Sequence, residues 1–326
     1  MRKLASIQKI KSIEPIPSAD SIMKATVLGW QLVIKKEEFN AGDWCVYVEI
    51  DSVLPEQPAF EFLRNKNFRI KTIKLRGQVS QGICFPLSIL PVDLAIEEGM
   101  DVTEVLGIIK YEPPIPANMQ GVMKGTFPSF IPKTDETRVQ VLQDLLDANK
   151  GELCYITEKL DGTSATYFIK DGVFGVCSRN LELEESADNL YWKVAYQLNL
   201  EEKLKSCGAN IAIQGELVGE GVQGNKLKLR GQHLYAFNVF FIDEYRYAMY
   251  HEWINILNVL GIQPVPVIEE YYRLSNDIDS LLSMSELASQ INSGVIAEGI
   301  VIRLKESKEH ISFKAISNTF LLKYGE

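Results

Sequence analysis

Hydrophobic and polar residues alternate in short runs over the first hundred positions of the chain. They predict strands at 5–13, at 22–35 with an interruption at Gly29, and at 44–50, 69–75 and 82–87. Turn residues separate these runs, as at 18–20, 40–43 and 76–78. Many short strands with few helices predict a small β-barrel, and we expect an OB-fold over residues 1–104, although other small barrels share this pattern.

A proline-rich stretch follows, with prolines at 113, 114, 116, 128 and 132. It predicts a linker over 105–130, and a second domain over 131–326. A capping box of Thr137 and Gln140 predicts a helix through Asn149. Further helices are expected at 185–206, 249–260 and 278–291, and further strands at 153–156, 165–169, 172–177, 212–218, 226–230, 234–242, 297–304 and 310–316. Mixed strands and helices after an all-β domain predict an α+β protein.

Composition limits the class of protein. Apolar residues make up 46% and charged residues 24% of the 326 residues, as in ordinary globular domains. No apolar run approaches the length of a membrane span, and the amino terminus lacks the apolar core of a signal peptide. Five scattered cysteines indicate reduced thiols rather than a disulfide framework or a zinc site. We expect a cytoplasmic monomer with no membrane partner.

A basic run stands out against the net charge of −9. Six cations and no acid fall between Arg64 and Arg76, with Phe68 among them as a possible stacking partner. One interpretation is a pair of solvated strands. The other is a track for a nucleic-acid backbone, with these candidate residues: Arg69, Lys71, Lys74 and Arg76.

The most informative motif is Thr157-Glu158-Lys159-Leu160-Asp161-Gly162. A lysine amine near a phosphate can attack it once deprotonated, and a turn glycine lets the backbone approach a bulky ligand. Alone, the motif is equally compatible with a surface hairpin that carries a solvated lysine. Further polar or aromatic segments follow it in order: 178–180, 213–219, 234–240, 297–303 and 311–315.

Taken together, Lys-x-Asp-Gly and these segments resemble the motifs of the covalent nucleotidyltransferase superfamily over residues 131–326. The chain is most similar to ATP-dependent RNA ligases that carry an OB-fold domain before the adenylyltransferase domain. The resemblance implies that ATP and Mg²⁺ or Mn²⁺ are used to join RNA 3′-OH and 5′-phosphate ends through lysyl-AMP. The expected partner is RNA or a nicked RNA/DNA duplex, in RNA repair.

The resemblance also implies residue roles. Lys159 would be the nucleophile, and Lys314 would touch the α-phosphate. Phe237 would stack on adenine, and Arg138 would reach the β- or γ-phosphate. The whole implied nucleotide site is Glu158, Lys159, Arg138, Arg179, Phe237, Glu298 and Lys314, and the residues implied to hold a metal through its water shell are Asp161, Glu216 and Glu298.

The chemistry of the lysine makes a metal necessary. A free lysine has a pKa of ~10.4 and is mostly protonated at neutral pH. A divalent cation and Lys314 would lower this pKa, while Asp161, Glu216 and Glu298 would raise it unless a cation neutralises them. We therefore predict that the metal is required for the attack itself.

The chain departs from the family pattern in its last motif. Ser312 stands where the first of two lysines is usual, so Lys305 or Lys323 could supply the missing charge. Only 12 residues follow Lys314, whereas DNA ligases and capping enzymes carry a further OB domain there. This argues against both classes and favours Arg138 as the pyrophosphate contact. The alternatives left open are a DNA ligase, a capping-type guanylyltransferase and a non-catalytic nucleic-acid-binding protein.

Residues 219–224 match the dinucleotide-binding pattern Gly-x-Gly-x-x-Gly. The segment 226–230 alternates like a strand where that motif needs a helix, so we reject a Rossmann site. The alternation instead predicts one basic strand face that contacts a nucleic-acid backbone, or an ordinary exposed strand, with Lys226, Lys228 and Arg230.

Overall fold

The computed structural model describes residues 2–112, 122–305 and 310–325. It divides into two compact units. The first contains residues 1–113, 139–145 and 318–326, and the second contains residues 114–138 and 146–317. We call them the N-terminal unit and, because it contains the predicted nucleophile Lys159, the catalytic unit. The predicted domain boundaries stay a prediction.

The N-terminal unit is built on an antiparallel five-stranded sheet. Its strands, in spatial order, are β3 (Trp30–Lys35), β2 (Ile22–Val27), β1 (Ala5–Pro15), β4 (Trp44–Val48) and β8 (Ile83–Phe85). The first half of β1 pairs with β4 and the second half pairs with β2, with an irregularity after Ile10. A bend of this kind lets one strand serve both sides of a small barrel.

Two small sheets and two 3₁₀ helices complete this part of the unit. β5 (Ser52–Val53) pairs with β9 (Ile109–Lys110), and β6 (Ile73–Leu75) pairs with β7 (Gln78–Ser80). The 3₁₀ helices are η1 (Pro58–Lys66) and η2 (Leu87–Ile89). The predicted strand 69–75 is therefore limited to its last three residues, and Phe68 is only 4% exposed. A stacking role for Phe68 is wrong, because its ring belongs to the core.

The predicted helix 137–149 is also wrong in its first turns. Thr137 and Arg138 form strand β11, which pairs in parallel with residues 313 and 314. The 3₁₀ helix η3 (Val139–Val141) and helix α2 (Gln143–Ala148) follow. Backbone pairing with a distant strand overrides the local capping signal. Helix α7 (Asn318–Tyr324) is the last element of the chain.

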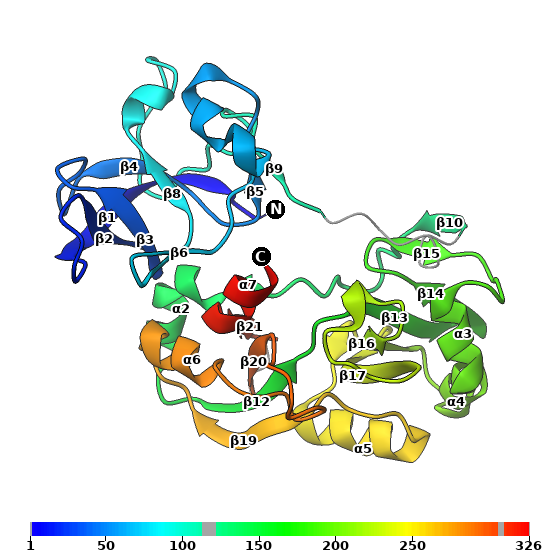
Figure 1. Ribbon diagram of the computed structural model, residues 1–326. Helices are drawn as coiled ribbons and strands as arrows, with labels where there is room; N and C mark the ends of the chain where they lie inside the picture. The colour runs from blue at the N-terminus through cyan, green and yellow to red at the C-terminus, as the bar shows by residue number, and fades with distance from the viewer. Residues whose placement is uncertain (1, 113–121, 306–309, 326) are drawn as a thin grey trace. The chain divides into compact units, whose positions relative to one another are not determined.

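The catalytic unit contains a seven-stranded sheet (Figure 1). Its strands, in spatial order, are β10 (Met123–Thr126), β15 (Leu181–Leu183), β14 (Val173–Cys177), β13 (Thr163–Lys170), β16 (Ile211–Gly219), β17 (Gln232–Phe241) and β18 (Arg246–Tyr247). One face packs on helices α3 (Leu190–Gln197), α4 (Leu200–Ser206) and α5 (Tyr250–Leu260). Alternate positions of β13 and β16, such as Tyr167 and Ile213, supply that core.

A five-stranded sheet forms the other half of this unit (Figure 1). Its order is β11, β21 (Ser312–Ile316), β20 (Gly299–Leu304), β12 (Leu153–Lys159) and β19 (Val267–Arg273). Only β11 is parallel to its neighbour. Helix α6 (Ile278–Met284) lies between β19 and β20 in the chain.

Several predicted elements differ from the structure. The helix predicted over 185–206 is two helices, α3 and α4, with Asn199 left-handed between them. The helix predicted over 278–291 ends at Met284. Residues 226–230 form no strand: the short 3₁₀ helix η4 (Gln223–Asn225) precedes them, and Lys228 has a positive φ of 55°. The Rossmann site stays rejected, but the strand that we used to reject it is absent.

Two parts of the interval 105–130, which was predicted as a linker, belong to sheets as strands β9 and β10. Residues 113–121 lie outside the described residues. All five cysteines are free thiols. Within the described part of the chain, no helix is both long enough and apolar enough to cross a membrane.

Candidate active site

One face of the five-stranded sheet gathers the site. Thr157, Val301, Lys314 and Arg138 are register partners on four adjacent strands. Register partners point to the same face, and so do residues two positions apart on one strand. Lys159 is therefore on the same face as Lys314 and Arg138. Three cationic groups that are far apart in sequence meet here because of strand pairing.

Two glycines hold the backbone close at this face. A Cβ on Gly162 would lie 2.2 Å from the carbonyl oxygen of Leu217, so no other residue fits after Asp161. A Cβ on Gly299 would lie 2.2 Å from the carbonyl oxygen of Ala315. These close approaches fix the ends of β12 and β20, and with them the positions of Lys159 and Glu298.

The ammonium group of Lys159 donates a hydrogen bond to Glu298 Oε2 at 2.7 Å. The two side chains are only 23% and 12% exposed. Desolvation would lower the pKa of Lys159, but the charges of Glu298, Glu216 and Asp161 outweigh it and raise this pKa. In this state the lysine is a protonated partner of an ion pair and not a nucleophile.

Glu216, on β16, faces the same cluster. Burial raises the pKa of Glu216 to about 8, with Glu298 and Asp161 adding to the shift and Lys159 and Arg179 opposing it. Three carboxylates, Asp161, Glu216 and Glu298, are thus close enough to act on one another in this buried place.

Asp161 is paired with a residue that the sequence placed elsewhere. Lys226 Nζ lies 3.2 Å from the carboxylate of Asp161, and the two side chains are 17% and 13% exposed. Lys226 was predicted to lie on a basic strand face with Lys228 and Arg230, but the chain is not a strand there. It points at the catalytic cluster instead, whereas Lys228 and Arg230 are exposed.

The remaining predicted nucleotide residues lie around this centre. Phe237 is the extra residue of a β-bulge, because Ala236 pairs with Gly215 while Asn238 pairs with Gln214. It is partly buried against the main core. Arg179, in the loop after β14, forms an ion pair with Asp135.

Glu158 points to the face opposite Lys159, as alternation along β12 requires. Its Oε2 accepts a hydrogen bond from the backbone N–H of Gln290 at 2.8 Å, while Oε1 has no hydrogen-bond partner among the described residues. Burial raises the pKa of Glu158, and hydrogen bonds from Ser289 and Gln290 oppose this. The side chain therefore keeps an unused acceptor atom in a buried position.

The comparisons with known proteins agree with this geometry. The RNA ligase family matches residues 152–316, and an OB-fold domain matches residues 4–87. The Naegleria gruberi RNA ligase with PPi is 40% identical, with a TM-score of 0.94 over 100% of this chain and 99% of that chain. Variants of that ligase with ATP and Mn, and with AMP and Mn, are each 40% identical, with TM-scores of 0.93 over 98% of both chains. No curated protein matches the chain.

The chain belongs to the RNA ligase family. The prediction of an ATP-dependent RNA ligase with an N-terminal OB-fold domain is confirmed, and so is the α+β fold class. The residue roles inside the site stay predictions, since the comparisons name no residue of this chain.

The carboxylates of this RNA ligase fit a hydrated cation. Among the described residues, no group of three or more His, Cys, Asp or Glu side chains could ligate a metal directly. Burial raises the pKa of Glu216, and Glu298 and Asp161 add to the shift, so a cation near these three carboxylates would stabilise their charged forms. Contact through metal-bound water, as the sequence predicted for Asp161, Glu216 and Glu298, satisfies both observations.

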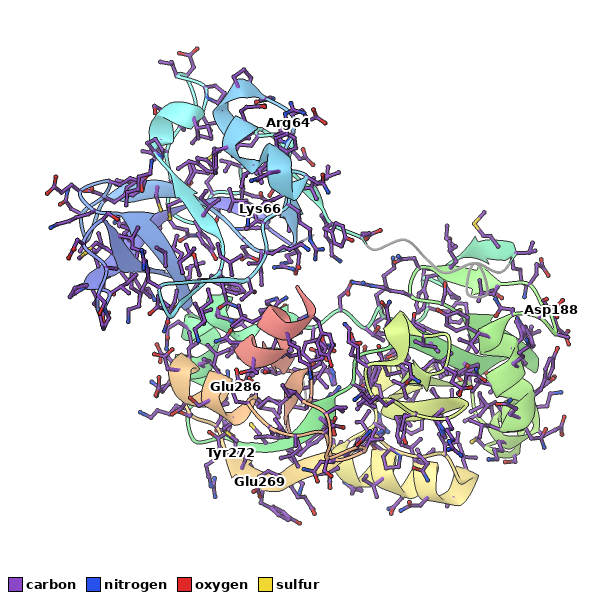
Figure 2. All side chains as sticks on the ribbon, in the orientation of Figure 1. Arg64, Lys66, Asp188, Glu269, Tyr272 and Glu286 are labelled. Atoms are coloured by element: carbon purple, nitrogen blue, oxygen red, sulfur yellow. The ribbon has the colours of Figure 1, made fainter. Side chains whose placement is uncertain are left out.

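The residues of the predicted basic track on the ligase's N-terminal unit differ in how exposed they are. Lys71, Lys74 and Arg76 are exposed, whereas the Arg69 side chain is 12% exposed and lies over the Tyr111 ring at 3.4 Å. Figure 2 shows Arg64 and Lys66 on η1, and Arg64 pairs with Glu56 and Glu61. The accessible cations therefore concentrate on the β6–β7 hairpin.

This hairpin has a tight turn that presents one of its cations. Arg76 and Gly77 both have positive φ, 48° and 88°, as a type I′ turn requires. Lys74 and Arg76 are exposed at its end. The sequence identified these two cations, but nothing in it separated them from the covered Arg69.

Proposed function

We propose that this ATP-dependent RNA ligase seals breaks that present an RNA 3′-OH beside a 5′-phosphate, through a lysyl-AMP intermediate and an adenylated 5′ end. One observation carries the proposal: Lys159, bonded to Glu298 at 2.7 Å, shares a sheet face with Lys314 and Arg138. A nucleophile, charge-stabilising cations and carboxylates are thereby assembled for phosphoryl transfer.

In the first step the amine of Lys159 attacks the α-phosphorus of ATP. A nitrogen–phosphorus bond forms, the bond to the bridging oxygen breaks, and pyrophosphate leaves. Lys314 would hold charge on the α-phosphate, and Arg138, its register partner, would hold the departing pyrophosphate. An in-line transfer of this kind depends mostly on positioning and electrostatics.

Lys159 must lose a proton before it attacks. Its ion pair with Glu298 favours the protonated form, so Glu298 has to give up this contact. A divalent cation, when bound, supplies the positive charge that neutralises the carboxylates and polarises the α-phosphate. Asp161, Glu216 and Glu298 would hold its water shell. The structure of a Naegleria gruberi RNA ligase variant with ATP and Mn supports ATP and a divalent cation here.

Adenine recognition would fall to Phe237. The bulge turns Phe237 out of the regular alternation of β17, which suits a ring that stacks on a base. A contact of Glu158 with adenine stays a prediction of the resemblance, because its side chain points to the face opposite Lys159. Arg179 would leave Asp135 to meet the nucleotide or the 5′-phosphate.

In the second and third steps the 5′-phosphate of RNA takes the adenylate from Lys159, and the 3′-OH then attacks that phosphate and releases AMP. Exposed cations of the β6–β7 hairpin, with Lys228 and Arg230, would contact the polynucleotide backbone. A 2′-OH at the 3′ end would distinguish RNA from DNA.

The test is sealing of matched nicked duplexes that differ only in the sugar of the nucleotide carrying the 3′-OH. We expect faster sealing with ribose at this position than with deoxyribose, on an RNA or DNA template. Equal or faster sealing of the all-DNA nick would contradict the proposal in favour of a DNA ligase. Labelling of the enzyme by GTP but not ATP would indicate a capping-type enzyme.

A further inference from the structure

Residues 132–138, which we call the lead-in segment, run from the seven-stranded sheet to the five-stranded sheet within the catalytic unit. The carbonyl oxygen of Pro132 accepts a hydrogen bond from Gln214 Nε2 at 2.8 Å, and Thr134 Oγ1 lies 2.8 Å from Ser164 Oγ. Both partners belong to the seven-stranded sheet. The segment ends as β11, at the edge of the five-stranded sheet. The segment therefore connects the two sheets, and Arg138 is its last residue.

Glu136 attaches the segment to the five-stranded sheet just before β11. Its Oε2 accepts a hydrogen bond from Ser312 Oγ at 2.6 Å, and its Oε1 lies 3.8 Å from Arg303 Nη2. Arg303 in turn donates to Thr157 Oγ1 at 2.9 Å. These side chains follow the strand order β11, β21, β20 and β12, so the network crosses the sheet strand by strand.

Because the network is buried, its charged groups need well-placed partners. Arg303 is 3% exposed, and a guanidinium in such a place needs a carboxylate and further hydrogen bonds. The charge of Glu136 is drawn toward Arg303, while Ser312 fixes the other carboxylate oxygen. Ser312 is also the residue that departs from the two-lysine pattern. A hydroxyl here binds the lead-in segment without adding a second cation beside the deeply buried Arg303.

The network joins β11 to β21 beside the pairing of Arg138 with Lys314. Arg138 stands two residues after Glu136, and Lys314 stands two residues after Ser312. These four positions share one face of two adjacent strands. A hydrogen bond between Glu136 and Ser312 therefore helps to fix the spacing of Arg138 and Lys314. The Ser312–Glu136 hydrogen bond thus adds a side-chain contact to the two backbone register pairs of this short edge strand.

We propose that Ser312 and Glu136 are positioning residues that set Arg138 against the pyrophosphate leaving group. The inference rests on the proposed function, in which Arg138 holds that group. Pyrophosphate leaves only when Lys159 attacks ATP. It takes no part when a 3′-OH attacks an already adenylated 5′-phosphate and AMP leaves. The two steps should therefore respond differently to loss of the Ser312 hydroxyl.

The experiment compares Ser312→Ala with Ser317→Ala in the full chain. Ser317 makes an equivalent hydrogen bond to Glu286 Oε2 at 2.8 Å, beyond the other end of β21, so it controls for the loss of a serine–glutamate contact. Two single-turnover rates are measured: transfer of AMP from labelled ATP to the enzyme, and sealing of a nicked duplex that carries a pre-adenylated RNA 5′ end. Pyrophosphate-driven release of AMP from the adenylated enzyme is the third readout.

We expect Ser312→Ala to slow adenylation, and the pyrophosphate-driven reversal, about fivefold to tenfold. Sealing of the pre-adenylated nick should change less than about twofold, since a neutral truncation away from the reacting atoms costs little there. Ser317→Ala should change none of the three rates, and Ser312→Thr, which keeps the hydroxyl, should restore adenylation. Equal losses in both forward steps, or no loss in adenylation, would overturn the inference.

Failure of the proposed function would look different. It would appear in the parent protein, as absence of AMP transfer or of sealing. A variant that is merely misfolded would lower its melting temperature and lose both steps together, and Ser312→Thr would then decide whether the hydroxyl matters.

Discussion

The strands and the loops of the catalytic unit carry their charged groups in two different ways. Lys314 and Arg138 lie within paired strands, and Lys159 ends another, so backbone hydrogen bonds set their spacing. Arg179, Asp161 and Lys226 lie on loops, and ion pairs hold them: Arg179 with Asp135, and Lys226 with Asp161. The first set is positioned before any ligand binds.

This difference separates two roles. Groups fixed by strand register can stabilise charge in the transition state without further reorganisation. Groups held by ion pairs can exchange partners when a nucleotide or cation enters, and the cost is only the pair that they leave. Glu298 belongs to both sets. It directly precedes Gly299, where β20 begins, and its carboxylate forms an ion pair with Lys159.

The largest effect on the adenylation rate should come from Glu298, which is positioned both by a strand and by an ion pair. Glu298→Ala removes the partner of Lys159 and one residue of the proposed water shell. We expect adenylation to fall about 10- to 100-fold, as is typical when an outer partner of a metal is lost. AMP transfer at saturating Mn²⁺ measures this, with Glu286→Ala as a control outside the site. An unchanged rate would contradict a role for Glu298.

Glu216→Gln should have a smaller effect on rate and an effect on stability that depends on pH. The folded pKa of Glu216 is about 8 against an ordinary value of 4.5, so the folded state favours its protonated form. Stability of the metal-free protein should therefore decrease as pH rises from 4.5 to 8. Glutamine removes this penalty, and the variant should melt above the parent at pH 9 and level with it at pH 4.

Adding Mn²⁺ gives a second test of the difference between the parent and Glu216→Gln. It should stabilise the parent at pH 9 more than it stabilises Glu216→Gln, because the charge that it neutralises is absent from the variant. Thermal melting with and without Mn²⁺ measures this difference. Identical melting temperatures of parent and variant at pH 9 without metal would contradict the raised pKa.

Lys226→Ala tests the loop-held class directly. If the lysine and the cation compete for Asp161, its removal should lower the Mn²⁺ concentration that gives half-maximal adenylation, about threefold. Lys228→Ala, two residues away and exposed, is the matched control. A higher metal requirement for Lys226→Ala would instead make the lysine part of the bound state.

The smallest effect is expected in the N-terminal unit. Lys74→Ala with Arg76→Ala removes two exposed cations of the β6–β7 hairpin. RNA binding should weaken and its dependence on log salt should become shallower by about 2, while AMP transfer is unchanged. Arg64→Ala, whose side chain is already paired with Glu56 and Glu61, should leave the salt dependence as it is. An unchanged dependence of RNA binding on salt in the double variant would show that the hairpin does not contact the RNA backbone.

The resemblance to the nucleotidyltransferase motifs predicted most of the strand-held site. Lys159, Glu216, Glu298 and Lys314 lie on or beside apolar strands, and the alternation that buries those strands also fixes which way each group points. Motif order then brought them together. Arg138 was identified too, but on a helix that does not exist there, because its partner strand lies 176 residues further along the chain.

Loop positions could not be predicted in the same way. The alternation of 226–230 has the period of a strand, but no neighbouring strand pairs with it, and Lys226 turns toward Asp161 instead. In the basic run, Arg69 and Phe68 look like their neighbours in sequence. Only the packing of Tyr111 and of the core shows that they are covered.

The central claim is tested most directly by incubating the protein with ATP labelled in the α-phosphate and Mn²⁺, denaturing it, and locating the label. The account predicts one labelled peptide, with AMP on the side-chain nitrogen of Lys159, and no label on Lys159→Ala. Label of equal intensity on Lys159→Ala, or a labelled peptide without residue 159, would contradict it.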